Sequence, residues 1–306
     1  MAVEGESSEW ARSQFREGLS LEQLVALPGT TFTSFAMQIV RQRAAQVPVQ
    51  RLIGRYLANR FARPTPVPAL AIRRVEDVFI DRACGPFELV ALAPLVPFGT
   101  HSQLTGISQN RMVTALRDAE VAGDPTVGLT LEAAVRRRQQ PQSSDPVRLA
   151  ATQRVTRAQR FTGPDSFAHF TLGALVTAAR ARSGDRFEAD ALVAHAAIYV
   201  NTLRTLGFDH PTLAISDFAE RPTTFCETIA QRVEDDLRTT PSIDTTRTAG
   251  RGYYDGLCFK IAVNDGDLEV GDGGTVTWTA QLNQSRPERC FTTGISIERL
   301  ALHSRG

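Results

Sequence analysis

The chain has 306 residues, of which 42% are hydrophobic and 22% charged, and its 34 Lys and Arg nearly cancel its 33 Asp and Glu to a formal net charge of +1. This length allows one large domain or a domain with an appendage, and the charge balance excludes the clearly basic composition typical of nucleic-acid-binding proteins. No apolar stretch reaches the roughly 18 to 20 residues that span a bilayer, and the acidic start MAVEGESSEW is unlike a signal peptide, so we expect a cytoplasmic protein with no membrane partner.

The first 70 residues are expected to form a helical N-terminal extension. Between Ser34 and Phe61 apolar residues recur at helical spacing and are interrupted at Pro48, which predicts two helices or one kinked helix. Three prolines between Ala62 and Ile72 predict an extended connector. We place a boundary there, so that residues 71–306 form the main domain.

The central block alternates apolar runs bounded by turn residues, typical of strands, with amphipathic stretches, typical of helices. Strands are predicted at Phe87–Val96, Val147–Phe161, Phe167–Ala179 and Pro211–Ser216, and helices at Thr130–Gln140, Asp185–Gly207 and Thr223–Arg238. A Gly-Pro-Asp turn is expected between the second and third of these strands. The three arginines that end the first helix suit the negative end of its dipole, which favours a solvated helix terminus over a nucleic-acid contact.

The C-terminal block opens on GRGYYDGLCFKIAV (Gly250–Val263), where two tyrosines stand side by side before a predicted strand. A glycine-rich turn is expected at Gly271–Thr275, a strand at Val276–Leu282, and a strand-to-helix unit at Phe291–Ser304. Strands that look antiparallel, with helices between them, favour an α+β fold.

The four cysteines are widely spaced and include no Cys-x-x-Cys pair: they are Cys84, Cys226, Cys258 and Cys290. Paired or clustered spacing is the usual signature of a disulfide framework or a metal site. We therefore expect reduced, partly buried thiols.

Several short segments, in the right order over about residues 86 to 304, resemble motifs of the histidyl-tRNA synthetase catalytic domain. The family loop R-G-L-D-Y-Y-T-G and the strand after it are matched by Tyr253, Tyr254, Gly256 and Phe259. Its G-G-R-Y-D segment is matched by Gly273 and Gly274, and its third class II motif by TGISIERL, which ends Glu298–Arg299–Leu300. Its R-P-E-G-T resembles VPFGT (Val96–Thr100), and its second class II motif, F-R-Y-E-R, resembles TRAQR (Thr156–Arg160).

The resemblance implies a class II synthetase-like antiparallel sheet flanked by helices, and it extends to the regulatory paralogue of histidine biosynthesis, which keeps the fold without aminoacylation. It also implies that the protein binds ATP with Mg²⁺ and activates a small carboxylic or amino acid as an adenylate. Glu288 or Glu298 could hold the metal, and the sequence does not choose between them.

The resemblance also assigns roles to single residues. Arg157 would hold the α-phosphate and the incoming carboxylate, and Arg299 would contact the adenine and the γ-phosphate, because guanidinium groups match phosphate oxygens. Arg251 is a candidate catalytic arginine. Glycines would let the backbone approach the nucleotide, and four further residues would bind the substrate. The glycines are Gly273, Gly274 and Gly294, and the substrate-binding residues are Thr100, Gln159, Tyr253 and Tyr254.

The sequence departs from the family pattern at charged positions. The acid of R-P-E-G-T, which holds the substrate ammonium in the family, falls on Phe98, and the acid of the second motif falls on Gln159. The arginine that opens the tyrosine loop falls on Ala249, unless a shift of two residues lets Arg251 replace it. An ammonium group would then need another partner, such as Glu88, Asp217 or Asp255.

Two functions remain open. The first is a stand-alone, ATP-dependent adenylate-forming ligase, favoured by Arg157 and Arg299. The second is a non-catalytic regulatory or ligand-sensing subunit, favoured by Ala249, Gln159 and Phe98. The chain stops after the third motif, so we expect no anticodon-binding domain and no recognition of a tRNA anticodon. A homodimer is expected by analogy, although the sequence does not place the family's first motif.

Overall fold

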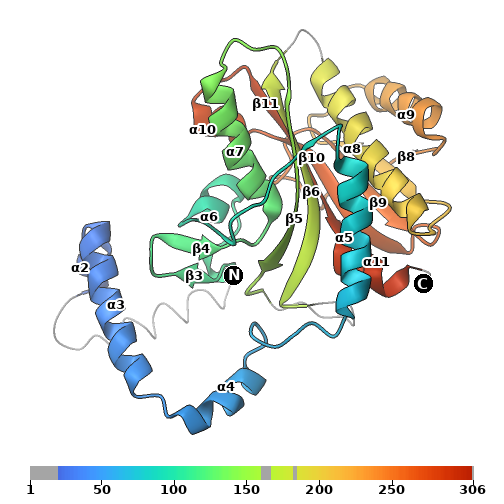
Figure 1. The fold of residues 1–306 in the computed structure, drawn as a ribbon. Helices are drawn as coiled ribbons and strands as arrows, with labels where there is room; N and C mark the ends of the chain where they lie inside the picture. The colour runs from blue at the N-terminus through green and yellow to red at the C-terminus, as the bar shows by residue number, and fades with distance from the viewer. Residues whose placement is uncertain (1–19, 160–166, 182–184, 305–306) are drawn as a thin grey trace.

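The computed structural model describes residues 20–159, 167–181 and 185–304. A single mixed sheet of eight strands runs through the main body (Figure 1). In spatial order the strands are β1 (Glu88–Leu89), β5 (Val147–Thr156), β6 (His169–Arg180), β11 (Glu288–Ser296), β10 (Leu268–Val276), β9 (Leu257–Val263), β7 (Thr212–Asp217) and β8 (Ser242–Ile243). The pairs β1–β5 and β7–β8 are parallel and the others antiparallel, which confirms the α+β class.

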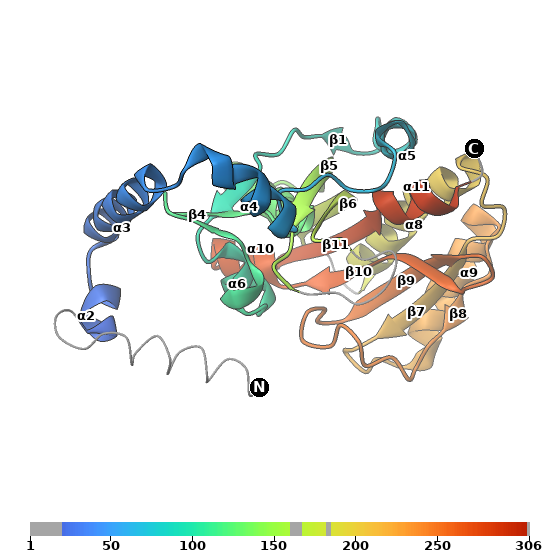
Figure 2. The ribbon, with the colours of Figure 1, turned by 90° about the horizontal axis from the view of Figure 1, so that it is seen from below.

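Helices cover both faces of this sheet (Figures 1 and 2). One face packs against α5 (Ala69–Ala83), α8 (Arg186–Thr205), α9 (Thr223–Leu237) and α11 (Ile297–His303), and the other against α7 (Pro125–Gln139) and α10 (Trp278–Asn283). Strand β6 is apolar on both sides because it lies between them: Leu175 faces the first layer, and Ala174 and Val176 face the second.

A small antiparallel sheet flanks the α7 side of the body. It contains β2 (Leu95–Pro97), β4 (Ala119–Val121) and β3 (Thr114–Ala115), in that order. Between them lie the short helix α6 (Thr100–Thr105) and the 3₁₀ turn η2 (Gln109–Arg111). This unit leads directly into the N-terminus of α7.

Apart from Phe87–Val96, the predicted central strands and helices are confirmed. The strands predicted at Val147–Phe161 and Phe167–Ala179 are β5 and β6, and the turn expected between them lies outside the described residues. The helix predicted at Asp185–Gly207 is α8, and Gly207 follows it with a φ of 87°. Glycine adopts that left-handed conformation without steric cost.

Two predictions near the C-terminus are wrong. The glycine-rich segment Gly271–Thr275 is not a turn but the middle of strand β10, and Val276–Leu282 is not a strand because helix α10 begins at Trp278. The backbone N–H of Thr277 donates to Asp255 Oδ2 at 2.9 Å, and the buried Trp278 ring packs against Tyr253. These tertiary contacts fix a helical turn at a sequence with good strand propensity.

Two further predictions need correction before residue 100. The segment Phe87–Val96 is not one buried strand: it contains only β1 and the start of β2, and Leu89 and Leu95 are exposed. The connector ends at Pro68 rather than Ile72, since α5 begins at Ala69. The sequence analysis missed α5, although Ile72, Val75, Phe79 and Ala83 are its buried face at helical spacing.

The N-terminal segment lies outside the body (Figures 1 and 2). It contains α2 (Leu21–Val25), α3 (Gly29–Ala45), the 3₁₀ turn η1 (Val49–Arg51) and α4 (Leu52–Ala58), which confirms helices on either side of Pro48. None of these helices has a buried residue. No helix in the described part of the chain is long and apolar enough to cross a membrane.

Candidate functional site

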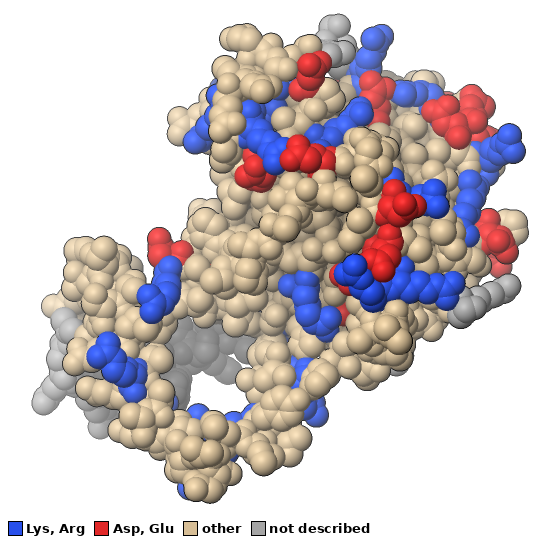
Figure 3. Space-filling model, viewed as in Figure 1, with Lys and Arg blue, Asp and Glu red and all other residues tan. Residues whose placement is uncertain are grey.

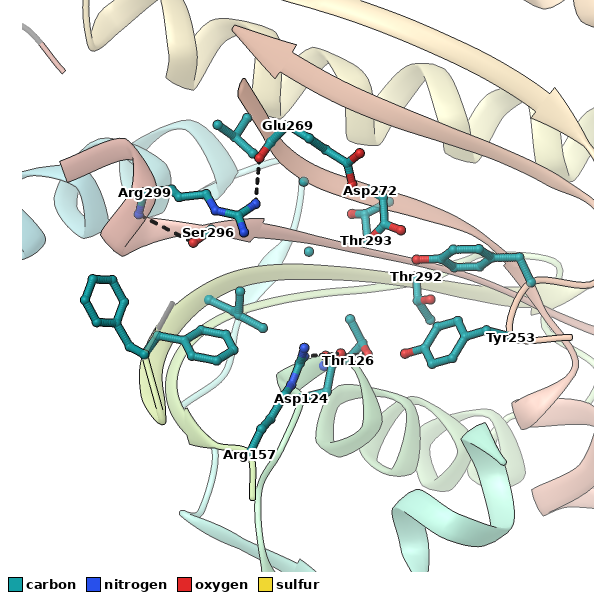
Figure 4. Close-up of a pocket in the computed structure, with 17 residues that line it drawn as sticks. Asp124, Thr126, Arg157, Tyr253, Glu269, Asp272, Thr292, Thr293, Ser296 and Arg299 are labelled. Atoms are coloured by element: carbon teal, nitrogen blue, oxygen red, sulfur yellow. Dashed lines mark hydrogen bonds and ion pairs between the residues drawn. The ribbon is translucent and has the colours of Figure 1, made fainter. Parts of the chain in front are cut away.

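A pocket with a cavity of about 230 Å³ opens on the face of the sheet beside α7 and the tyrosine loop (Figure 4). Its walls come from the turn before α7, the ends of β5 and β6, the tyrosine loop, β10, β11 and the first turn of α11. The polar and charged residues among its lining are Asp124, Thr126, Arg157, Tyr253, Tyr254, Glu269, Asp272, Thr292, Thr293, Ser296 and Arg299. Of the residues suggested by the sequence, Arg157, Tyr253, Tyr254, Gly294 and Arg299 meet here.

An ion pair lies at one end of the pocket. Asp124 caps α7, and its Oδ1 accepts hydrogen bonds from the backbone N–H of Thr126 at 2.9 Å and from the Thr126 hydroxyl at 2.7 Å. Its Oδ2 lies 3.3 Å from Nη2 of Arg157, whose Nε donates to the carbonyl of Gly123 at 2.8 Å. Both side chains remain partly exposed, so the pair presents an acid and a guanidinium to the same cavity.

Buried polar groups hold the turn that carries Asp124. The backbone N–H of Gly123 donates to Nε2 of His101 at 3.0 Å, and Nδ1 of His101 lies 2.7 Å from Glu120 Oε1. Accepting from Gly123 at Nε2 implies that Nδ1 carries the proton and donates to Glu120. Burial by itself would raise the pKa of Glu120, but hydrogen bonds from the His101 backbone, Gln109 and the His101 ring outweigh it and lower that pKa.

The two adjacent tyrosines form one wall. Their rings meet edge to face with centroids 4.9 Å apart, and the Tyr253 ring also meets Trp278 edge to face at 5.3 Å. The side chain of Tyr253 hydrogen-bonds Thr126, and that of Tyr254 hydrogen-bonds Asp272. Burial raises the pKa of both phenols well above the usual value, so both remain neutral donors.

A second charge pair supports this wall from behind. Nη2 of the buried Arg247 lies 3.3 Å from Oδ2 of Asp272, and its Nε donates to the carbonyl of Ala249 at 2.9 Å. Burial raises the pKa of Asp272, and the charge of Arg247 opposes that rise. The sequence analysis missed both residues.

Arg251, the candidate catalytic arginine, is not among the residues that line the pocket. Its side chain is 54% exposed, with Glu220 Oε1 3.8 Å away and the Phe218 ring 4.9 Å from its guanidinium carbon. The inward-facing arginine of this loop is therefore Arg247, two residues before the position that the family pattern indicated.

The opposite end of the pocket contains Arg299, in the first turn of α11. Its Nη1 donates to the carbonyl of Glu269 at 2.7 Å, and its backbone N–H donates to the Ser296 hydroxyl at 3.5 Å (Figure 4). Arg157 and Arg299 thus lie on opposite walls of one cavity, from elements that are far apart in the sequence.

The residues that the structure describes do not form a resident metal site. Both acids suggested for Mg²⁺ are buried in structural pairs: Glu288 with Arg137 at 3.0 Å, and Glu298 with the backbone N–H of Thr171 at 2.6 Å and with Arg154 at 3.1 Å. In the described ranges, no three His, Cys, Asp or Glu side chains are grouped so that they could hold a metal ion.

The three glycines suggested for nucleotide contact have different surroundings. Gly294 lines the pocket, and a Cβ added there would meet no heavy atom within 4 Å. Gly273 and Gly274 are not among the lining residues. A Cβ on Gly274 would lie 2.6 Å from the Cβ of Cys258, so its backbone packs too closely for any side chain.

Thr100 and Gln159 also lie outside the lining of the pocket. Thr100 is buried at the start of α6, where its hydroxyl donates to the carbonyl of Pro97 at 2.6 Å. The carbonyl of Gln159 accepts a hydrogen bond from Arg60 at 3.2 Å. Arg160, the last residue of the second motif, lies outside the described residues.

The acid at this end of the pocket comes from a different segment than the family pattern indicated. Phe98 is 51% exposed and does not line the pocket, whereas Asp124 and Thr126 offer an acid and a hydroxyl within it. The alternatives considered from sequence lie elsewhere: Glu88 pairs with Arg136, Asp217 pairs with Arg221, and Asp255 caps α10 through Thr277. The signal that could have identified Asp124 is Asp-Pro-Thr ahead of the helix predicted at Thr130–Gln140, a typical N-cap sequence, and α7 begins at Pro125 for that reason.

No protein-family model matches the sequence, and no curated protein matches it. The structure is similar to an ATP phosphoribosyltransferase regulatory subunit/histidyl-tRNA synthetase from Bacillus halodurans, with a TM-score of 0.62 and 14% identity over 80% of this chain and 82% of that chain. It is also similar to apo histidyl-tRNA synthetase from S. aureus (TM-score 0.57, 14% identity, 76% of this chain and 64% of that chain). A third similar structure is a histidine–tRNA ligase subunit from Alicyclobacillus acidocaldarius (TM-score 0.56, 14% identity, 78% of this chain and 94% of that chain).

The chain therefore covers less than two thirds of the S. aureus enzyme and most of the other two proteins. At these identities the likeness shows the fold. It confirms the class II synthetase-like architecture that the sequence motifs predicted, and it is shared by synthetases and by the regulatory subunit.

Proposed function

We propose that this pocket binds a small amino acid together with ATP and joins them as an aminoacyl adenylate. The observation that carries the proposal is the pair formed by Asp124 and Arg157, which offers an acid and a guanidinium 3.3 Å apart at the end of a cavity that also contains Arg299. An amino acid is a zwitterion, and this pair is complementary to both of its charges.

The residues suggest a specific arrangement. Asp124 and the Thr126 hydroxyl would accept hydrogen bonds from the ammonium group, and Arg157 would hold the carboxylate. When a carboxylate oxygen attacks the α-phosphorus, a new P–O bond forms, negative charge grows on the phosphoryl oxygens, and pyrophosphate leaves. Arg157 would stabilise that charge from one side, and Arg299 would hold the polyphosphate from the other.

The site would accept ATP through guanidinium groups and open backbone rather than through a protein-bound metal. Gly294 leaves space at the cavity wall, and Arg157 and Arg299 lie on either side of it. Mg²⁺ usually reaches such sites on the phosphates of the nucleotide and neutralises part of their charge.

One wall of the pocket favours an amino acid with an apolar part. Phe170 and Leu172 on β6 face the cavity, and the Arg157 guanidinium carbon lies 5.2 Å from the Phe170 ring centroid. Polar contacts to the far end of the side chain would come from Asp272 and Tyr254 on the opposite wall.

A second function, a non-catalytic amino-acid sensor, is favoured by a different observation. Arg251 is exposed, and Arg247 faces Asp272. Arg157 and Arg299 are thus the arginines that line this pocket in the described part of the chain, and Arg157 is already paired with an acid. With one of its two arginines neutralised by an acid, the pocket is better matched to a zwitterionic amino acid than to a triphosphate with several negative charges.

We also propose that the protein forms a homodimer. Helix α5 leads into β1, which pairs only with β5 and leaves one edge of the large sheet unpaired in the described structure. Leu89, on β1, is exposed at that edge. Light scattering after size-exclusion chromatography should give twice the chain mass of 33.4 kDa; the chain mass alone would contradict the proposal.

The test of the enzymatic function is ATP–pyrophosphate exchange with Mg²⁺, over the standard amino acids and a panel of small carboxylates. We expect exchange with one acid or a small group of acids. Arg157→Ala and Arg299→Ala should each reduce it by about a hundredfold, since a positioned charge at a developing anion contributes roughly that factor. Arg232→Ala, an exposed ion-paired arginine on α9, is the matched control and should retain full activity.

Calorimetry with the same panel separates the two functions. Binding of an amino acid without exchange for any acid would contradict the ligase and support the sensor. Neither binding nor exchange, in protein that is folded by circular dichroism, would contradict both.

A further inference from the structure

The segment before the main body is strongly basic. Residues 28–63, called the arm below, contain six arginines and no Asp or Glu: Arg41, Arg43, Arg51, Arg55, Arg60 and Arg63. Because the whole chain carries +1, the rest of it carries 1 − 6 = −5. Figure 3 shows basic side chains spread along the visible face of the arm, between patches of uncharged surface.

The two main helices of the arm each have an apolar face. At 100° per residue, the exposed side chains Phe32, Phe35, Ile39 and Val40 fall within an arc of about 140° on α3, which is interrupted only by Arg43 in the last turn. The opposite face of that helix carries Thr30, Ser34, Gln38 and Arg41.

Helix α4 repeats this division. Leu52, Ile53, Tyr56 and Leu57 share about 140° of its surface, with Gly54 and Arg55 on the other side. All four apolar side chains are exposed, Ile53 to 72%. The chain therefore has two successive amphipathic helices whose apolar faces have no cover within the described structure.

This exposure requires a partner surface. Short helices that pack against nothing are marginal in water, and their stability ordinarily comes from burying the apolar face. Contiguous exposed apolar surface marks an interaction site. The base of the arm is fixed, since Arg60 donates to the carbonyl of Gln159 at 3.2 Å and the carbonyl of Arg63 lies 2.6 Å from Nε2 of His169. The helices beyond that base project away from the body (Figures 1 and 2).

We infer that the arm binds an anionic lipid surface, with α3 and α4 lying in the plane of the interface. Apolar arcs of this width insert at the boundary of headgroups and acyl chains, and arginines beside them pair with lipid phosphates and carboxylates. The absence of a spanning segment does not oppose this, because an interfacial helix needs an apolar face rather than an apolar run of about 20 residues. The expectation of no membrane partner rested on the lack of a spanning segment and of a signal peptide, and neither observation bears on an interfacial helix.

Charge favours lipid over a second copy of the chain. Outside the arm, residues 1–27 carry a balance of 2 − 5 = −3 and residues 64–306 a balance of 26 − 28 = −2, so neither part of a second copy matches the six arginines. The apolar arcs favour lipid over RNA, since phosphates would pair with the arginines and leave Phe35, Ile39 and Ile53 in water.

The test is flotation of the full chain with vesicles. One set is phosphatidylcholine alone, and in the other about one lipid in three is phosphatidylserine. We expect binding to the anionic vesicles, weak binding to the neutral ones, and loss of binding as salt rises.

Two double variants separate the two forces. Phe35→Ser with Ile53→Ser removes apolar contact, and Arg41→Glu with Arg55→Glu reverses charge; each should reduce binding at least tenfold. All four side chains belong to helices without buried residues, so the body should remain folded. The matched controls are Leu302→Ser, an exposed apolar residue on α11, and Arg232→Glu on α9, both of which should bind like the unaltered protein.

Three results would overturn the inference. The first is no binding of the unaltered protein to anionic vesicles. The second is a variant with apolar substitutions that becomes monomeric by light scattering while vesicle binding is unchanged, which would make the apolar faces an interface between copies. The third is tighter retention on polyuridylic acid than on vesicles, sensitive to the arginine substitutions alone, which would assign the arm to RNA. None depends on adenylate formation, so failure here is distinct from failure of the proposed function.

Discussion

Asp124 combines two roles at the scale of a single residue. It caps α7 through Thr126, and it pairs with Arg157 across the pocket. Asparagine caps helices about as well as aspartate, so Asp124→Asn removes the charge and keeps the helix.

We expect Asp124→Asn to weaken amino-acid binding about tenfold or more, because a hydrogen bond to a charged group contributes roughly 1.5–3 kcal/mol. Its melting temperature should stay close to that of the unaltered protein. Phe98→Ala is the matched control at the position indicated by the sequence motif, and it should bind normally because Phe98 lies outside the pocket. Calorimetry decides the matter: a loss of binding in Phe98→Ala with normal binding in Asp124→Asn would contradict this assignment.

His195 has a structural role with a pH signature. It is fully buried under the sheet, between the hydroxyls of Thr177 and Thr293, both 2.8 Å away. Burial, with a smaller contribution from Arg148, lowers the pKa of this imidazole to about 3. These contacts make it a packing residue of the core.

A depressed histidine pKa makes stability depend on pH in one direction. The unfolded chain binds a proton below about 6.5, whereas the folded chain does so only near 3, so stability falls as pH drops between these values. The contribution at pH 5 is about 2 kcal/mol, from 1.5 pH units at about 1.36 kcal/mol each. Urea unfolding at pH 7, 6 and 5 should show this loss in the unaltered protein and not in His195→Gln. Parallel stability curves for the two proteins would be the contrary result.

At the scale of single elements, the neighbouring strands β10 and β11 place their glycines in different surroundings. Gly274 packs against Cys258 with no room for a side chain, while Gly294 on the neighbouring β11 faces open space. The family resemblance groups both with nucleotide binding, but the geometry assigns only Gly294 to the pocket.

Gly274→Ala should lower the free energy of unfolding by about 1–3 kcal/mol, the usual cost of overpacking. Gly294→Ala should leave that free energy nearly unchanged and weaken ligand binding, because its methyl group would enter the cavity. Thermal unfolding and calorimetry on both variants provide the comparison. Equal destabilisation by the two substitutions would contradict the assignment of Gly274 to close packing and of Gly294 to the open pocket.

At this scale the sequence predicts elements well where burial is regular. Helix α8 and the β5–β6 hairpin follow their periodic patterns closely, because each buries a continuous face against the body. Strand β10 and helix α10 were predicted wrongly, because local glycine content and strand propensity were overridden by close backbone packing and by the buried Trp278.

At the scale of the whole molecule, the N-terminal helices add no buried residue to the core of the body. Helices α2, α3 and α4 contribute no buried residue, whereas α5 buries four apolar side chains against the sheet. The predicted boundary near residue 70 stays a prediction, and it can be tested by truncation.

A chain without residues 1–58 keeps Arg60 and Arg63 at the base of the arm. We expect its melting temperature to lie within about 5 °C of the full chain, equivalent to roughly 1–2 kcal/mol for a protein of this size, and we expect unchanged amino-acid binding. Vesicle binding should be lost. Failure of the truncated chain to fold would show that the arm is part of the body's stability.

The sequence by itself determined the class of fold, most of the sheet and the presence of Arg157, Arg299 and the tyrosine pair in one site, because these depend on local periodicity and on short motifs in a fixed order. Only the tertiary structure decided which acid faces that site and which loop arginine pairs with Asp272 in its wall. Asp124 and Arg157 are 33 residues apart in the chain, and Arg247 and Asp272 are 25 apart, so both pairs form only when the turn before α7, the β5 end, the tyrosine loop and β10 meet at one pocket. Sequence motifs do not predict these ion pairs, since charge pairing depends on distance in space and not on distance in sequence.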